Sequence, residues 1–188
     1  MRIIAGRHRG QLLAAPAGDI VRPTGERARE ALFNILAHGK FAAAGPAYAG
    51  AEIVDAFAGT GAFGLEALSR GAAHVVFIEN DRTALAALRQ NIAALGEEKR
   101  SRIASGDATS PPRALAPASL AFLDPPYGKG LAVPALTALA AAGWLAAGAL
   151  CVVETAAKER VAPPPGFAAL DERRYGAARL AFLRYGEG

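Results

Sequence analysis

The segment with the clearest chemical potential is Asp124-Pro125-Pro126-Tyr127, which directly follows the apolar run 120–123. The two prolines remove two N–H donors, so the turn presents acceptors: the carboxylate of Asp124 and backbone carbonyls. Two acceptors that hold the N–H bonds of an aromatic amine stabilise the positive charge that develops when its nitrogen attacks a methyl group. The ring of Tyr127 can stack on the base. We therefore expect these four residues to form a catalytic turn, rather than only a proline turn with a capping aspartate.

A second motif follows the apolar run 52–57, where Gly59, Gly61 and Gly64 match the G-x-G-x-x-G spacing. Glycines at these positions let the backbone turn sharply and approach a ligand closely. Glu79 lies twenty residues after Gly59, where a carboxylate can accept from the ribose hydroxyls of an adenosine. The motif predicts an adenosine-containing ligand, and both NAD and S-adenosylmethionine remain open on this evidence.

Asp55 favours S-adenosylmethionine, because it places a charge within an otherwise apolar strand just before the glycines. A pyrophosphate would be repelled by this carboxylate, whereas the ammonium of a methionine tail would pair with it. Asp107 follows a third predicted strand, where its carboxylate could accept from an adenine amine. The expected donor-binding residues are Asp55, Phe57, Gly59, Gly61, Glu79, Asp107 and Ala108.

Positive charge gathers at the start of the chain. The formal net charge of the 188 residues is +4, and residues 1–30 contain six arginines against three acidic residues, a net +3. A basic arm before a nearly neutral region is typical of a protein that contacts nucleic-acid phosphates. The expected RNA-binding residues are Arg2, Arg7, Arg9, Arg22, Thr24, Arg27 and Arg29. A merely solvated arm is the alternative.

Composition narrows the class further. The chain is 52% hydrophobic, which suffices for a full core, yet no uninterrupted apolar stretch reaches the roughly 18 residues of a membrane span. The start lacks the long apolar region of a secretory signal. One cysteine and three scattered histidines exclude a disulfide and predict no metal site. We expect a cytoplasmic protein that contacts no membrane and is a monomer.

The elements that position these motifs alternate along most of the chain. Residues 2–5 and 11–14 predict a β-hairpin, Thr24 a helix cap, and 26–38 a helix. Strands are expected at 52–57, 74–78, 102–104, 120–123, 149–153 and 180–184, and helices at 62–70, 82–95 and 131–144. This alternation is typical of an α/β fold with a mostly parallel sheet and helices on both faces. We expect an RNA-binding extension at 1–40 and a methyltransferase domain at 41–188.

Taken together, the motifs resemble a known family. Asp-Pro-Pro-Tyr marks amino-group methyltransferases of the Rossmann-like class. The arm narrows the resemblance to the bacterial small-subunit ribosomal RNA guanine-N2 methyltransferases of the D type, through Arg2-Ile3-Ile4-Ala5-Gly6, Arg9-Gly10, Arg22-Pro23-Thr24, Arg27 and Leu32-Phe33-Asn34. The similarity extends to Gly64-Leu65-Glu66-Ala67-Leu68-Ser69-Arg70 and Gly143-Trp144-Leu145. It implies a seven-stranded sheet with an antiparallel last strand, S-adenosylmethionine as donor, and an assembling small-subunit particle as substrate.

Three alternatives stay open at this point. An NAD-dependent oxidoreductase would explain the glycine spacing but has no use for Asp55 or the proline turn. An RNA-binding module with a degenerate cofactor site is opposed by the intact motifs. Methylation of adenine N6 in DNA or RNA is chemically close, because the same proline turn serves both amines.

Overall fold

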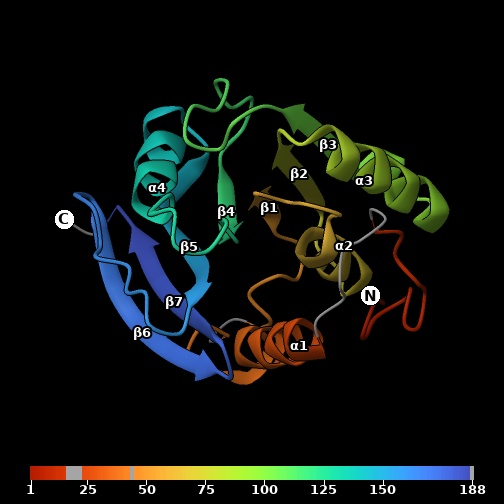
Figure 1. The fold of residues 1–188 in the computed structure, drawn as a ribbon, viewed down its shortest axis with the longest axis horizontal. Coiled ribbons are helices and arrows are strands. Elements are labelled where there is room, and N and C mark those ends of the chain that lie inside the picture. Colours follow the sequence, from red (N-terminus) through yellow and green to blue (C-terminus); the bar gives the residue numbers. More distant parts are fainter. Residues whose placement is uncertain (16–22, 43–44, 187–188) are drawn as a thin grey trace.

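The computed structural model describes residues 1–15, 23–42 and 45–186. One seven-stranded sheet forms its centre (Figure 1). The strands are β1 (Glu52–Ala56), β2 (His74–Glu79), β3 (Ser101–Ser105), β4 (Ala118–Leu123), β5 (Leu145–Ala156), β6 (Phe167–Tyr175) and β7 (Ala178–Tyr185). They lie in the order β3-β2-β1-β4-β5-β7-β6.

Strands β3, β2, β1, β4 and β5 run parallel, and β7 is antiparallel to both of its neighbours. The expected mostly parallel sheet with an antiparallel last strand is confirmed. Because β1 and its two neighbours end in register, with Ala56 beside Ile78 and Leu123, the turns that follow them meet at one edge. Ligands of open α/β sheets bind at this carboxyl edge.

The helices are α1 (Pro23–His38), α2 (Ala62–Ser69), α3 (Arg82–Leu95) and α4 (Ala132–Ala141), with a short 3-10 helix at Glu98–Arg100. Alternate strand residues belong to two separate core clusters, as the two-residue period of a strand requires. Helices α1, α2 and α3 contribute to the cluster that contains Phe122, whereas α4 contributes to the one that contains Leu123. Helices therefore cover both faces of the sheet, as predicted (Figure 1).

Several element boundaries differ from the sequence prediction. Helix α1 begins at Pro23, so Thr24 lies within its first turn and is not the residue that precedes the helix. Proline suits a first helical position, because its missing N–H would have no partner there. Helix α4 ends at Ala141, three residues early, since Gly143 has a φ of 80° and turns the chain toward β5. Strand β6 was not predicted, because its charged residues indicated a solvated face.

The N-terminal arm, residues 1–15, folds back on itself beside α2 (Figure 1). Backbone hydrogen bonds join Ile3 to Gln11 and Leu13 to Met1, and Arg2 and Leu12 form one antiparallel bridge. This is a hairpin with a single bridge, shorter than the two strands that the sequence predicted. Ile3 and Leu13 are buried in the same core cluster as the residues of α1 and the sheet, so arm and sheet share one core.

Candidate active site

The predicted catalytic turn leaves β4 at the carboxyl edge of the sheet. The N–H of Asp124 lies 3.3 Å from the carbonyl oxygen of Ala56, so the turn starts beside the end of β1. Pro125 is buried, whereas Pro126 and Tyr127 are exposed. All four residues of the turn line a cavity of about 620 Å³. The turn is therefore rigid on its sheet side and open toward this cavity.

The glycine turn lines the same cavity. Phe57, Gly59 and Gly61 have φ values of 59°, 56° and 85°, and Phe57 is the one non-glycine residue with positive φ in the described part of the chain. Such a conformation costs roughly 1–3 kcal/mol and tends to occur at functional sites. A Cβ added at Gly61 would lie 2.4 Å from a methyl carbon of Leu88, so glycine is required for the turn to pack against α3.

Glu79 holds the glycine turn from the neighbouring strand. Its Oε2 accepts from the backbone N–H of Gly59 at 2.7 Å, and its Oε1 accepts from the N–H groups of Asn80 and Asp81 at 2.8 and 2.7 Å. Three backbone donors thus orient the carboxylate at the end of β2. The predicted contact of Glu79 with a ribose stays a prediction. The hydrogen bond from Gly59 to Glu79 is a structural role that the sequence did not predict.

Asp55 has a hydrogen-bond partner within the protein that the sequence did not predict. Its side chain is 1% exposed, and its Oδ2 accepts from the N–H of Gly64, in the first turn of α2, at 2.9 Å. Burial raises the pKa of Asp55 to about 8, against the opposing effect of the hydrogen bond from Gly64. Asp55 does not line the cavity. Asp55 therefore links β1 to α2, and its predicted ion pair with a methionine ammonium remains a prediction.

Asp107 and Ala108 follow β3 at the same carboxyl edge. Gly106 donates to the carbonyl of Glu79 at 2.9 Å, so this loop begins beside the end of β2. The carboxylate of exposed Asp107 accepts from both the N–H and the hydroxyl of Thr109 at 2.8 Å, which makes a tight local turn. Ala108 is buried. Neither residue lines the cavity, and their predicted contact with adenine remains a prediction.

Near the catalytic turn the cavity is also lined by two residues that sequence reasoning did not select, Glu26 of α1 and Glu154 of β5. Arg29 of α1, which the sequence predicted to bind RNA, lines it as well. Glu154 is 9% exposed, and its Oε1 accepts from the hydroxyl of Tyr127 at 2.7 Å. Burial raises the pKa of Glu154, whereas the Tyr127 hydroxyl and Arg29 oppose that rise. In the sequence, the only indication of a role for Glu154 was its charge within the apolar run of β5.

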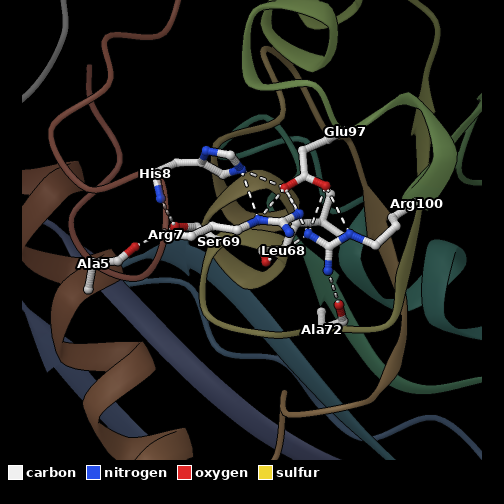
Figure 2. Close-up of polar contacts among 8 residues, drawn as sticks. All are labelled: Ala5, Arg7, His8, Leu68, Ser69, Ala72, Glu97 and Arg100. Carbon is white, nitrogen blue, oxygen red and sulfur yellow. Dashed lines mark hydrogen bonds and ion pairs between the residues drawn. The ribbon is translucent and has the colours of Figure 1, made fainter.

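The arm is fixed to the rest of the molecule by buried Glu97, which follows α3 (Figure 2). Its carboxylate accepts from the guanidinium groups of Arg7 and Arg100 and lies 2.6 Å from Nε2 of His8. Ser69 adds two contacts, because its hydroxyl oxygen accepts from the N–H of His8 at 3.0 Å and donates to the carbonyl of Ala5 at 2.6 Å. Arg7 is therefore an anchor of the arm, and its predicted contact with a phosphate remains a prediction.

A second buried carboxylate, Glu66 of α2, holds the first segment of the arm, just before the turn that contains Arg7 and His8. It accepts from the N–H groups of Ile4 and Ala5 at 2.7 and 3.0 Å and from Arg70 at 2.6 Å. Nε of Arg29 lies 3.9 Å from the same carboxylate. Arg29 is 3% exposed, and its guanidinium donates to the carbonyl of Arg2 at 2.7 Å. Arg29 is therefore held by contacts within the protein while it also lines the cavity, and its predicted contact with RNA remains a prediction.

The remaining arginines of residues 1–30 differ from Arg7 and Arg29 in their surroundings. Arg2, Arg9 and Arg27 are exposed, although the Nε of Arg2 lies 3.7 Å from the carboxylate of Glu26. Arg22 lies outside the described residues, as does the side chain of Thr24. Of the expected RNA-binding set, Arg2, Arg9 and Arg27 are thus exposed in the described residues, and Arg7 is exposed as well although it pairs with Glu97.

The described residues contain neither a metal-binding cluster nor a membrane-spanning helix. No group of three or more His, Cys, Asp or Glu residues in residues 1–15, 23–42 and 45–186 could hold a metal ion. No helix in this part of the chain has the length and hydropathy needed to cross a membrane.

The arrangement of these parts defines a class of protein. A glycine turn and an Asp-Pro-Pro-Tyr turn leave adjacent parallel strands and line one cavity. The sheet that carries them has β7 inserted antiparallel between β5 and β6. This combination is that of a Rossmann-like methyltransferase.

Comparisons with known proteins agree with this class. Residues 1–184 match the family model described as Conserved hypothetical protein 95. The chain is 37% identical to Ribosomal RNA small subunit methyltransferase D of Escherichia coli (strain K12). The alignment covers 98% of this chain and 89% of that relative. The corresponding protein of Haemophilus influenzae is 36% identical, with coverage of 94% and 89%. The solved structure of yhhF from Escherichia coli aligns with a TM-score of 0.82 at 34% identity, over 100% of this chain and 99% of that one.

The chain therefore belongs to the family of ribosomal RNA small subunit methyltransferase D. The resemblance inferred from the motifs is confirmed.

Proposed function

We propose that this protein transfers a methyl group from S-adenosylmethionine to the exocyclic N2 amine of a guanine in small-subunit ribosomal RNA. The observation that carries the proposal is the Asp124–Tyr127 turn, which lines the same cavity as the glycine turn. The names of the relatives at 36–37% identity support an RNA substrate from the small ribosomal subunit.

The residues around the glycine turn fit S-adenosylmethionine. Positive φ at Phe57 and Gly59 brings the backbone to the surface of the cavity, and a Cβ on Gly59 would meet nothing within 4 Å. The carboxylate of Glu79 lies beside this turn, where it could hold a ribose. When bound, S-adenosylmethionine supplies a methyl group on a sulfonium, which is activated toward attack by an amine.

The catalytic turn acts on the acceptor amine. The carboxylate of Asp124 and the carbonyl of Pro125 accept the two N–H bonds of the amine, which directs the nitrogen lone pair out of the base plane. The same acceptors stabilise the positive charge that forms on nitrogen, because they are already oriented by the backbone. The ring of Tyr127, with its hydroxyl fixed on Glu154, stacks on the base and sets its line of approach.

The exposed arginines of the arm contribute RNA affinity. Arg2, Arg9 and Arg27 contact phosphates of the RNA, while the buried pairs of Arg7 and Arg29 keep the arm in place. We assign residues 1–40 to RNA binding and residues 41–188 to methyl transfer, a division by role within one shared core. We propose that the enzyme acts as a monomer in the cytoplasm, on an assembling small-subunit particle.

The test is transfer of labelled methyl from S-adenosylmethionine to small-subunit RNA, and to small-subunit particles, from a strain that lacks the enzyme. We expect label in N2-methylguanosine after digestion to nucleosides. Asp124→Asn should lower the rate about ten- to a thousandfold while donor binding is retained, because one charged acceptor is lost. Glu98→Gln, an equivalent change at an exposed site, should leave the rate unchanged. Full activity in Asp124→Ala would contradict the catalytic assignment.

The alternative is methylation of adenine N6, which the proline turn alone would also serve. The same digestion separates the two, because label would then appear in N6-methyladenosine.

A further inference from the structure

We propose that Glu154 is the residue that selects guanine, by accepting the N1–H of the base while the Asp124 turn holds the adjacent N2 amine. The inference rests on the proposed methyl transfer and adds its base specificity, which the Asp-Pro-Pro-Tyr turn by itself leaves open.

The sheet places the two carboxylates side by side. Strands β4 and β5 are parallel, and Leu123 pairs with Val153, so the next residues, Asp124 and Glu154, follow at the same level. Side chains alternate along a strand, so both belong to the face of Phe122, which α1 and α2 cover. Both residues line the cavity of about 620 Å³. Neighbouring strands lie about 4.8 Å apart, a spacing that suits two adjacent donors on one base edge.

The surroundings of Glu154 hold it in one orientation. Tyr127 donates to Oε1 at 2.7 Å, and the carboxylate retains further lone pairs to accept with. Burial raises the pKa of Glu154, and the Tyr127 hydroxyl and Arg29, which lines the same cavity, oppose that rise. Tyr127 occupies one of the acceptor positions of this carboxylate, and the remaining lone pairs can accept from a base that enters the cavity.

The pattern of hydrogen-bond donors and acceptors on each base determines which base fits these two carboxylates. Guanine presents N1–H and the N2 amine as neighbouring donors, and two neighbouring acceptors match them. Adenine presents its N6 amine beside N1, and cytosine its N4 amine beside N3, which are both acceptors. An acceptor placed opposite a carboxylate is repelled and receives no hydrogen bond from it, which is a condition under which binding sites discriminate strongly. Glu154 and Asp124 together therefore fit guanine and reject the other two amines.

The experiment compares guanine with 2-aminopurine, which keeps the N2 amine but has an unprotonated N1. Small-subunit RNA is prepared with either base at the methylated position, once nucleoside mapping has located it. We expect the wild type to prefer guanine by about ten- to a hundredfold, as for loss of a hydrogen bond to a charged group. Glu154→Gln should reduce this preference at least tenfold, because a carboxamide can also donate to N1. Glu98→Gln should keep the wild-type ratio.

Two further variants separate specificity from positioning. Tyr127→Phe removes the hydrogen bond to Glu154 but keeps the ring, so it should lower the rate for both bases with less effect on their ratio. Glu154→Asp keeps an acceptor and should retain the preference for guanine. The inference is overturned if the wild type methylates both bases equally, or if Glu154→Gln, with donor affinity and Tm unchanged, keeps the wild-type ratio. Absence of N2-methylguanosine in the wild-type reaction would instead refute the proposed function itself.

Discussion

Replacing Asp55 by asparagine should make the protein more stable at alkaline pH. The carboxylate of Asp55 is 1% exposed and accepts from the N–H of Gly64. An asparagine amide oxygen can accept the same hydrogen bond in the same volume but carries no charge to desolvate. The substitution therefore removes the burial penalty and keeps the link between β1 and α2.

The size and sign follow from the pKa of Asp55, which burial raises from 3.8 to about 8. Between these values the folded protein binds a proton that the unfolded chain has lost, so the free energy of unfolding falls as pH rises. A tenfold change in proton affinity is worth about 1.4 kcal/mol, which sets an upper limit of about 6 kcal/mol for the whole window. Well above pH 8 the loss is complete, and the free energy of unfolding of the Asp55→Asn variant should exceed that of the wild type by an amount within this limit.

Urea unfolding at intervals from pH 5 to pH 9 measures this difference. The stability of Asp55→Asn should change less with pH than that of the wild type, while Glu98→Gln, an exposed control, should follow the wild type. Parallel stability curves for wild type and Asp55→Asn would refute the reasoning about burial. Donor affinity adds an independent check: a large loss of S-adenosylmethionine binding in Asp55→Asn would support the contact with the methionine ammonium that the sequence suggested.

Two further predictions concern the arm. Glu97→Gln should lower the free energy of unfolding by about 1–3 kcal/mol, because it removes the charge that Arg7 and Arg100 bind, and thermal unfolding measures the loss. Arg9→Ala should weaken RNA binding and reduce the slope of log affinity against log salt by roughly 0.7–0.9, without changing Tm. Arg7→Ala should mainly lower Tm, and an equal salt effect for both arginines would contradict the distinction between anchor and phosphate contact.

Much of the fold could be predicted because its determinants are local in sequence. The apolar runs that became β1, β2 and β4 each end in a turn of distinctive composition, and parallel strands bring such turns to one edge. The edge strand β6 escaped prediction, because one side of it faces solvent and its residues 171–174 are all charged. Short-range sequence patterns were thus sufficient to predict the buried strands. They failed to predict a strand that is buried on one face only.

Site residues that depend on long-range partners were not predictable in the same way. Arg7 and Glu97 are 90 residues apart in sequence, and no pattern in the arm indicated that this arginine would meet a buried carboxylate. Asp55 was recognised as unusual, but its partner is the N–H of Gly64, which composition does not reveal. The rule that buried charges need partners identified the residue correctly, and the fold was needed to identify the partner.

The buried carboxylate of Glu66 also explains how the basic arm can take part in the site at the carboxyl edge of the sheet. Glu66 binds the backbone of Ile4 and Ala5 and lies near Arg29, and Arg29 in turn lines the cavity with Glu154. Met1 and Ala15 line the cavity as well, so the two ends of the arm form part of its wall. A tethered, independently moving arm would need none of these contacts. The arm is therefore a fixed wall of the acceptor cavity, and its exposed arginines are held at a constant position relative to the catalytic turn.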